Sequence, residues 1–165
     1  MVEPLRYVSR SEEDTARLAR GLAEAAGKPG AVITLDGDLG AGKTAFSRHF
    51  AAAIGVEDPV NSPTFTIIKE YEGRTPEGGP LMLYHMDVYR IGEDEAAELG
   101  LDEYFYGGGV TLIEWADRIA GLLPDGRLSI RIEGSGEGER VFRITPHGAA
   151  AEEVCTRLKR SGLIP

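Results

Sequence analysis

Apolar and polar positions follow two different periods along the chain, and these divide the sequence into strands and helices. Short apolar or β-branched runs favour strands, whereas apolar residues three or four positions apart favour amphipathic helices. The expected strands are residues 31–35, 65–71, 81–86, 110–115, 128–132 and 141–145, and the expected helices are residues 11–26, 43–54, 93–99, 101–106 and 149–160. This alternation predicts an α/β sandwich that forms one domain over residues 1–165, with a mostly parallel central sheet, helices on both faces and an antiparallel edge.

The segment that joins the expected strand 31–35 to the expected helix 43–54 carries the sequence GDLGAGKT at residues 37–44. It matches the phosphate-binding pattern G-x-x-x-x-G-K-[ST] in the strand–loop–helix context that the pattern requires. Glycines let a backbone wrap closely around a phosphate, and the amides at a helix N-terminus favour an anion. We therefore expect a P-loop NTPase domain that binds ATP together with Mg²⁺.

Within this loop, Lys43 is expected to reach the β- and γ-phosphates and act in catalysis, and the Thr44 hydroxyl is expected to ligate Mg²⁺. The loop residues expected to contact the nucleotide are Asp38, Leu39, Gly40, Ala41, Gly42, Lys43, Thr44 and Ala45.

Two acidic residues, Asp87 and Glu114, close apolar strands and are candidates to complete the site. A phosphate loop needs a second metal-orienting carboxylate at the carboxyl end of a neighbouring strand. One of the two acids is expected to hold Mg²⁺, and the other to orient the attacking water. An ordinary helix cap or ion pair at a strand end remains the alternative for each.

Several other residues have weaker local signals. Residues 61–65, which include Thr64, follow the helix after the phosphate loop, where such proteins commonly sense the γ-phosphate; an ordinary turn is the alternative. His85 is more simply a packed histidine than a catalytic one. Trp115 is compatible with a core position, an adenine stack or a partner contact, and Arg140 follows a glycine-rich turn from which an arginine can reach a nucleotide.

The charge balance argues against direct nucleic-acid binding. The 165 residues include 27 acids and 18 bases, for a net charge of −9. A protein that binds nucleic acid alone usually presents a basic face, and the nearest approach to a basic cluster is residues 157–160 of the last predicted helix.

The single cysteine, Cys155, cannot form an internal disulfide, which agrees with a reducing compartment, and we expect it to be a small apolar residue of the last helix. The first residues lack an apolar signal core, and no apolar run approaches the length of a membrane span. A cytoplasmic protein is therefore expected.

Four motifs in order, GDLGAGKT (37–44), NSPTF (61–65), YHMDVYR (84–90) and LIEW (112–115), resemble the TsaE family, also called YjeE. The resemblance extends over nearly the whole chain, including the ELGLDEYF stretch at 98–105. It implies a bacterial P-loop ATPase of tRNA threonylcarbamoyladenosine (t6A) synthesis that acts with TsaB- and TsaD-type subunits and meets tRNA only through that complex. The TsaD-type subunit performs the threonylcarbamoyl transfer, and ATP hydrolysis resets the complex between turnovers.

The resemblance also implies roles for individual residues. Thr44 and Glu114 become Mg²⁺ ligands, and Asp87 becomes a catalytic or metal-organising acid. Thr64 becomes part of a γ-phosphate-responsive loop with a catalytic role, while Glu12 and Arg140 become nucleotide contacts. This chain has Phe65 where many relatives carry Tyr, and its 72–80 loop is longer; neither change affects the phosphate chemistry.

Three other functions remain open from the sequence. A small-molecule kinase usually has an arginine-bearing lid, but residues 93–109 are acidic and contain no arginine. A GTPase commonly has an N-K-x-D motif, which does not occur here. A non-catalytic, nucleotide-dependent assembly factor would keep the same binding residues.

Overall fold

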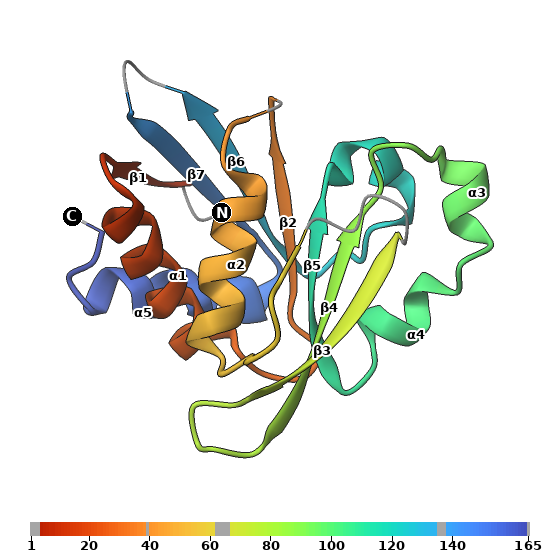
Figure 1. Cartoon of the computed structure of the whole chain (residues 1–165), viewed down its shortest axis with the longest axis horizontal. Helices are drawn as coiled ribbons and strands as arrows, with labels where there is room; N and C mark the ends of the chain where they lie inside the picture. Colours follow the sequence, from red (N-terminus) through yellow and green to blue (C-terminus); the bar gives the residue numbers. More distant parts are fainter. Residues whose placement is uncertain (1–3, 39, 62–66, 135–137, 165) are drawn as a thin grey trace.

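The structure, a computed structural model, describes residues 4–38, 40–61, 67–134 and 138–164, and their strands form one seven-stranded sheet (Figure 1). The strands are β1 (Leu5–Ser9), β2 (Val32–Gly37), β3 (Ile68–Arg74), β4 (Pro80–Asp87), β5 (Gly109–Glu114), β6 (Arg127–Gly134) and β7 (Arg140–His147). The helices are α1 (Glu12–Ala26), α2 (Lys43–Ala53), α3 (Glu93–Ala97), α4 (Leu101–Phe105), α5 (Ala149–Arg160) and the 3-10 helix η1 (Ala116–Leu122).

The sheet has a parallel centre and antiparallel strands at both edges. Its order is β1-β7-β6-β2-β5-β4-β3, and strands β6, β2, β5 and β4 run parallel to one another. Strand β3 pairs antiparallel with β4, whereas β7 and β1 extend the other side in antiparallel fashion. We expected one antiparallel edge; the second arises because the connections 75–79 and 135–139 are too short to cross the sheet, so each joins neighbouring antiparallel strands.

Two elements were not predicted from the sequence. Strand β1 has only five residues, and its pairing partner β7 lies at the other end of the chain, where Leu5 is in register with Ile144. The 3-10 helix η1 begins directly after Trp115, where we expected strand β5 to end; Trp115 itself has left the strand, with a φ of 64°.

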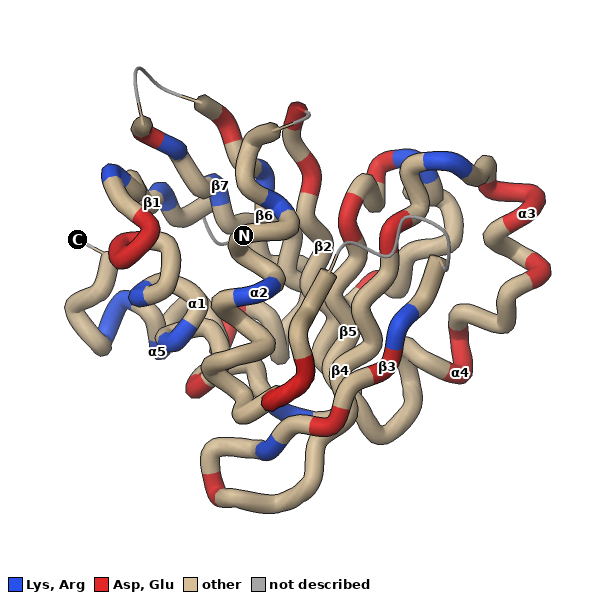
Figure 2. The backbone as a smooth tube through the Cα atoms, in the orientation of Figure 1, with Lys and Arg blue, Asp and Glu red and all other residues tan. Residues whose placement is uncertain are grey.

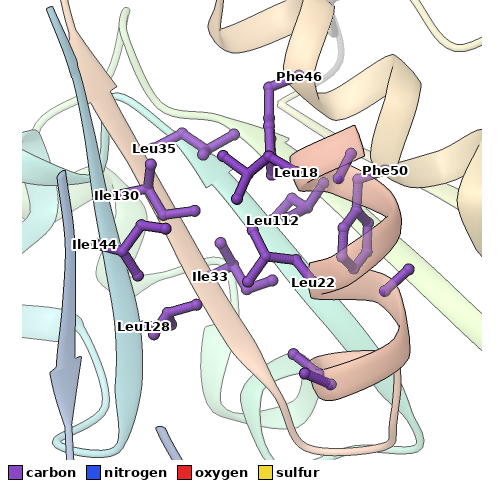
Figure 3. Packing of buried hydrophobic residues seen from close by; sticks show 14 of the residues in the cluster. Leu18, Leu22, Ile33, Leu35, Phe46, Phe50, Leu112, Leu128, Ile130 and Ile144 are labelled. Carbon is purple, nitrogen blue, oxygen red and sulfur yellow. The ribbon is translucent and has the colours of Figure 1, made fainter. Parts of the chain in front are cut away.

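Helices cover both faces of the sheet, as predicted. Alternate strand residues point to opposite faces, so Ile33 packs in one cluster and Val32 in the other. Figure 3 shows the larger cluster, in which α1 and α2 side chains meet the central strands. Its labelled residues are Leu18, Leu22, Ile33, Leu35, Phe46, Phe50, Leu112, Leu128, Ile130 and Ile144. The other cluster joins α3, α4 and η1 to the opposite face; its members include Met86, Ala96, Phe105, Ile113 and Ile119.

The fold aligns arginines that are far apart in the sequence. Arg6 of β1 is in register with Arg143 of β7, which is in register with Arg131 of β6 (Figure 2). Two of the three form exposed ion pairs: Arg131 with Asp117 at 2.5 Å, and Arg143 with Glu133 at 3.5 Å. The row therefore lies on a face of mixed charge and is not a basic cluster.

Within the described ranges, every helix is too short or too polar to cross a membrane.

Cys155 is expected to be unreactive in the folded protein. It is buried in α5 at 1% exposure, as predicted, and burial raises the pKa of its thiol to about 11. At pH 8 such a thiol is ionised to about one part in a thousand, compared with roughly a quarter for an ordinary thiol. Alkylation by iodoacetamide, followed by mass spectrometry, should be at least about 100-fold slower in the native protein than in urea. Native and unfolded rates within tenfold of each other would contradict this burial.

Candidate nucleotide-binding site

The loop from β2 to α2 is shaped by three glycines with positive φ. Gly37 has a φ of 153°, Gly40 of 77° and Gly42 of 109°. A Cβ at Gly37 would lie 2.4 Å from the backbone oxygen of Ile132, whereas a Cβ at Gly42 would meet nothing within 4 Å. Gly42 is the N-cap of α2 and caps it with no side-chain bond. The first amides of α2 are therefore left for an outside acceptor, as the predicted phosphate loop requires.

Lys43 is folded back over its own loop. Its side chain is 5% exposed, and Nζ donates hydrogen bonds to the backbone oxygens of Gly37 and Asp38, each at 2.8 Å. Nζ also lies 3.9 Å from the centroid of the Trp115 ring, a cation–π contact. Burial lowers the pKa of the Lys43 ammonium, while nearby carboxylates, Glu114 first among them, act in the opposite direction.

Glu114 lies at the carboxyl end of β5 and is 2% exposed. Thr44 Oγ1 donates to Glu114 Oε1 at 3.0 Å, although the two residues are 70 positions apart in the sequence. The other oxygen, Oε2, lies 3.4 Å from Ser47 Oγ and 2.5 Å from His85 Nε2. Glu114 can contact α2 because it pairs with Leu35, which places the end of β5 beside the strand that leads into the loop.

Asp87 lies beside Glu114 at the same edge of the sheet. The two residues are in register between β4 and β5, and Asp87 Oδ1 accepts a hydrogen bond from the Tyr89 amide at 2.9 Å. Asp87 is one of the carboxylates that oppose the lowering of the Lys43 pKa by burial, after Glu114 and Asp36. The structure thus brings both predicted acids to the loop, with Glu114 in contact with Thr44 and Asp87 one strand further away.

The two residues with looser sequence signals have different surroundings. Arg140 of β7 braces the loop, because its Nε donates to the Ala41 oxygen at 3.0 Å and its Nη2 to the Gly40 oxygen at 3.4 Å. Glu12 of α1 is exposed and contacts the side chain of His49 on α2 at 3.0 Å. Arg140 therefore reaches the loop itself, and Glu12 contacts the helix behind it.

Leu39 and Thr64 lie outside the described residues.

Two side chains of the site, Ser47 and His85, were given no role by the sequence. Ser47 follows Thr44 by three positions and therefore shares its face of α2. His85 precedes Asp87 by two positions on a strand. The spacing between Thr44 and Ser47 was a signal that could have identified Ser47 from the sequence. The spacing between His85 and Asp87 was not, because a polar residue in a buried strand usually has a local packing explanation.

No group of three or more His, Cys, Asp or Glu side chains suited to a metal ion occurs in the described part of the chain. A magnesium ion that binds with a nucleotide does not need one, because phosphates and water supply most of its ligands.

A family model described as threonylcarbamoyl adenosine biosynthesis protein TsaE matches residues 9–142, a range that contains every predicted site residue. The chain belongs to the TsaE family. It is 50% identical over 159 residues to the tRNA threonylcarbamoyladenosine biosynthesis protein TsaE of Bacillus subtilis, covering 96% of both chains. The TsaE protein of Treponema pallidum is 39% identical over 145 residues, covering 85% of this chain and 99% of the relative. The crystal structure of Bacillus subtilis YdiB matches with a TM-score of 0.82 and 46% identity, covering 98% of each chain.

The loop between β2 and α2 is expected to tolerate no residue other than glycine at position 37. In Gly37→Ala, the added Cβ meets a backbone oxygen that cannot rotate away, so the free energy of unfolding should fall by at least about 2 kcal/mol. Gly126→Ala is the matched control, because its Cβ meets nothing within 4 Å and its φ is not positive; it should change stability by less than about 0.5 kcal/mol. Urea unfolding measures both, and equal stabilities would contradict the described loop.

Proposed function

We propose that this TsaE-family protein is a Mg²⁺-dependent P-loop ATPase that acts in the synthesis of t6A in tRNA. The observation that carries the proposal is the contact between Thr44 at the start of α2 and the buried carboxylate of Glu114. A hydroxyl and a carboxylate side by side at a helix N-terminus are the donors that a nucleotide-bound magnesium ion takes from a protein. The names of the TsaE relatives support the biosynthetic role.

Different residues of the chain have different roles in the proposed phosphoryl transfer. The loop amides and Lys43 bind the phosphates, and the two backbone contacts of Lys43 are exchanged for phosphate oxygens. Thr44 and Glu114 would hold the ion, which would supply neutralisation of the charge that develops during transfer. Asp87, one strand away, either orients the attacking water or organises the ion's shell.

The partners in this proposal are TsaB- and TsaD-type subunits in the cytoplasm, with tRNA contacted only through their complex. The net charge of −9 supports an indirect role toward tRNA. Thr64, in the γ-phosphate-responsive segment, is proposed to couple hydrolysis to these partners.

Lys43→Ala should weaken ATP binding at least about tenfold while the protein remains folded, because it removes a charge-assisted contact to phosphate. Lys28→Ala is the control, since Lys28 is exposed at the opposite end of β2. Isothermal titration calorimetry gives both affinities, and circular dichroism checks the fold. A folded Lys43→Ala protein with wild-type affinity would refute the phosphate-loop assignment.

ATP hydrolysis by the isolated protein should be slow and should increase when the TsaB–TsaD pair is added, with ATP preferred to GTP. Thr64→Ala should reduce the partner-stimulated rate more than it reduces ATP affinity, because its hydroxyl is proposed to couple the γ-phosphate to the partners. Phosphate release measures the rates. Equal stimulation of both proteins would remove Thr64 from the mechanism, and nucleotide binding without any turnover would favour a non-catalytic assembly factor.

A further inference from the structure

His85 lies behind the candidate metal site, on β4, and is fully buried at 0% exposure. Its Nε2 lies 2.5 Å from Glu114 Oε2. Its Nδ1 is also buried, and the described part of the chain offers that atom no hydrogen-bond partner. The neutral tautomer that fits these surroundings carries its hydrogen on Nε2 and donates it to the carboxylate. The polar contact of this ring is therefore directed at Glu114.

The contacts of Glu114 distinguish its two oxygens. Oε2 is directed inward to His85, and Oε1 is directed to the Thr44 hydroxyl at the loop. Ser47 Oγ lies 3.4 Å from Oε2, but it also donates to the Lys43 backbone oxygen at 3.0 Å. The terminal torsion of a glutamate is broad, so a carboxylate without such partners would rotate. A donor on Oε2 restricts that rotation and keeps Oε1 beside Thr44.

Packing alone does not account for a histidine at this position. The residues that share the face of His85 on β4, Leu81 and Leu83, are apolar and fully buried, and both belong to the larger hydrophobic cluster. An apolar side chain would fill the same space without leaving a buried ring nitrogen unpartnered, which is unfavourable by itself. The one interaction that an apolar side chain could not supply is the hydrogen bond to Glu114.

We propose that His85 is a positioning residue that fixes the Glu114 carboxylate so that Oε1 is presented with Thr44 to a divalent cation. The inference rests on the proposed function, because it concerns the same Mg²⁺–nucleotide site. His85 acts only through Glu114, as partners of metal ligands commonly do.

The test compares two substitutions of similar length, His85→Gln and His85→Met. Glutamine keeps an N–H donor, whereas methionine has none. Nucleotide binding is titrated at a series of Mg²⁺ concentrations and followed by the fluorescence of Trp115, the single tryptophan of the chain. His85→Met should raise the Mg²⁺ concentration for half-maximal effect at least about tenfold, while affinity without Mg²⁺ changes less than about twofold. His85→Gln should remain within about threefold of wild type.

His147→Met is the control, because it makes the same substitution on β7 away from the site and should leave the Mg²⁺ dependence unchanged. If His85→Met does not fold, His85→Phe decides the question, since a phenyl ring fills the place of the imidazole without a donor; the Mg²⁺ requirement should again rise at least about tenfold.

Wild-type Mg²⁺ dependence in both His85 variants would overturn the proposal, as would equal losses in both, because a donor would then not matter. An unchanged Mg²⁺ requirement in His85→Phe, where that variant decides, would overturn it too. A wild-type protein that binds nucleotide without any Mg²⁺ effect would overturn the proposed function as well, so the two failures are distinguishable.

Discussion

The site depends on one buried negative charge, the carboxylate of Glu114. A carboxylate removed from water is strongly unfavourable unless donors compensate it. Here the donors come from two elements, Thr44 on α2 and His85 on β4, while Glu114 itself ends β5. The charge therefore ties the N-terminus of α2 to the carboxyl edge of the parallel strands. Such a group contributes little net stability compared with an apolar core, so stability alone does not explain its presence.

The second constraint is that contacts within the protein already compensate the positive charge of Lys43. Lys43 is bound to two backbone oxygens and lies over Trp115, which has a φ of 64° that non-glycine residues rarely adopt. Tyr89 supports the ring of Trp115 at a centroid distance of 4.6 Å. An incoming phosphate would exchange contacts with this ammonium, so binding and a change at Trp115 are linked in the proposed function.

Local patterns in the sequence were sufficient to predict most of the fold and the position of the loop between β2 and α2. The central strands are buried on both faces and are therefore mostly apolar, and the sequence GDLGAGKT falls between strand β2 and helix α2. Strand β1 was not predicted because it forms by pairing with β7, which is distant in the sequence; Leu5, for example, pairs with Ile144. Likewise, nothing near His85 in the sequence indicates Glu114, 29 positions away on the neighbouring strand. The alignment of Arg6, Arg143 and Arg131 also exists only in three dimensions.

The most direct measurement is a crystal structure of the protein with Mn²⁺ and a non-hydrolysable ATP analogue, in which anomalous scattering locates the metal. The account predicts phosphates around the amides of residues 40–44 and a metal at about 2.1 Å from Thr44 Oγ1. Glu114 Oε1 should face that metal, directly or through one water, with Oε2 still against His85. A metal and phosphates bound away from the N-terminus of α2, or a Glu114 carboxylate turned away from Thr44, would contradict it.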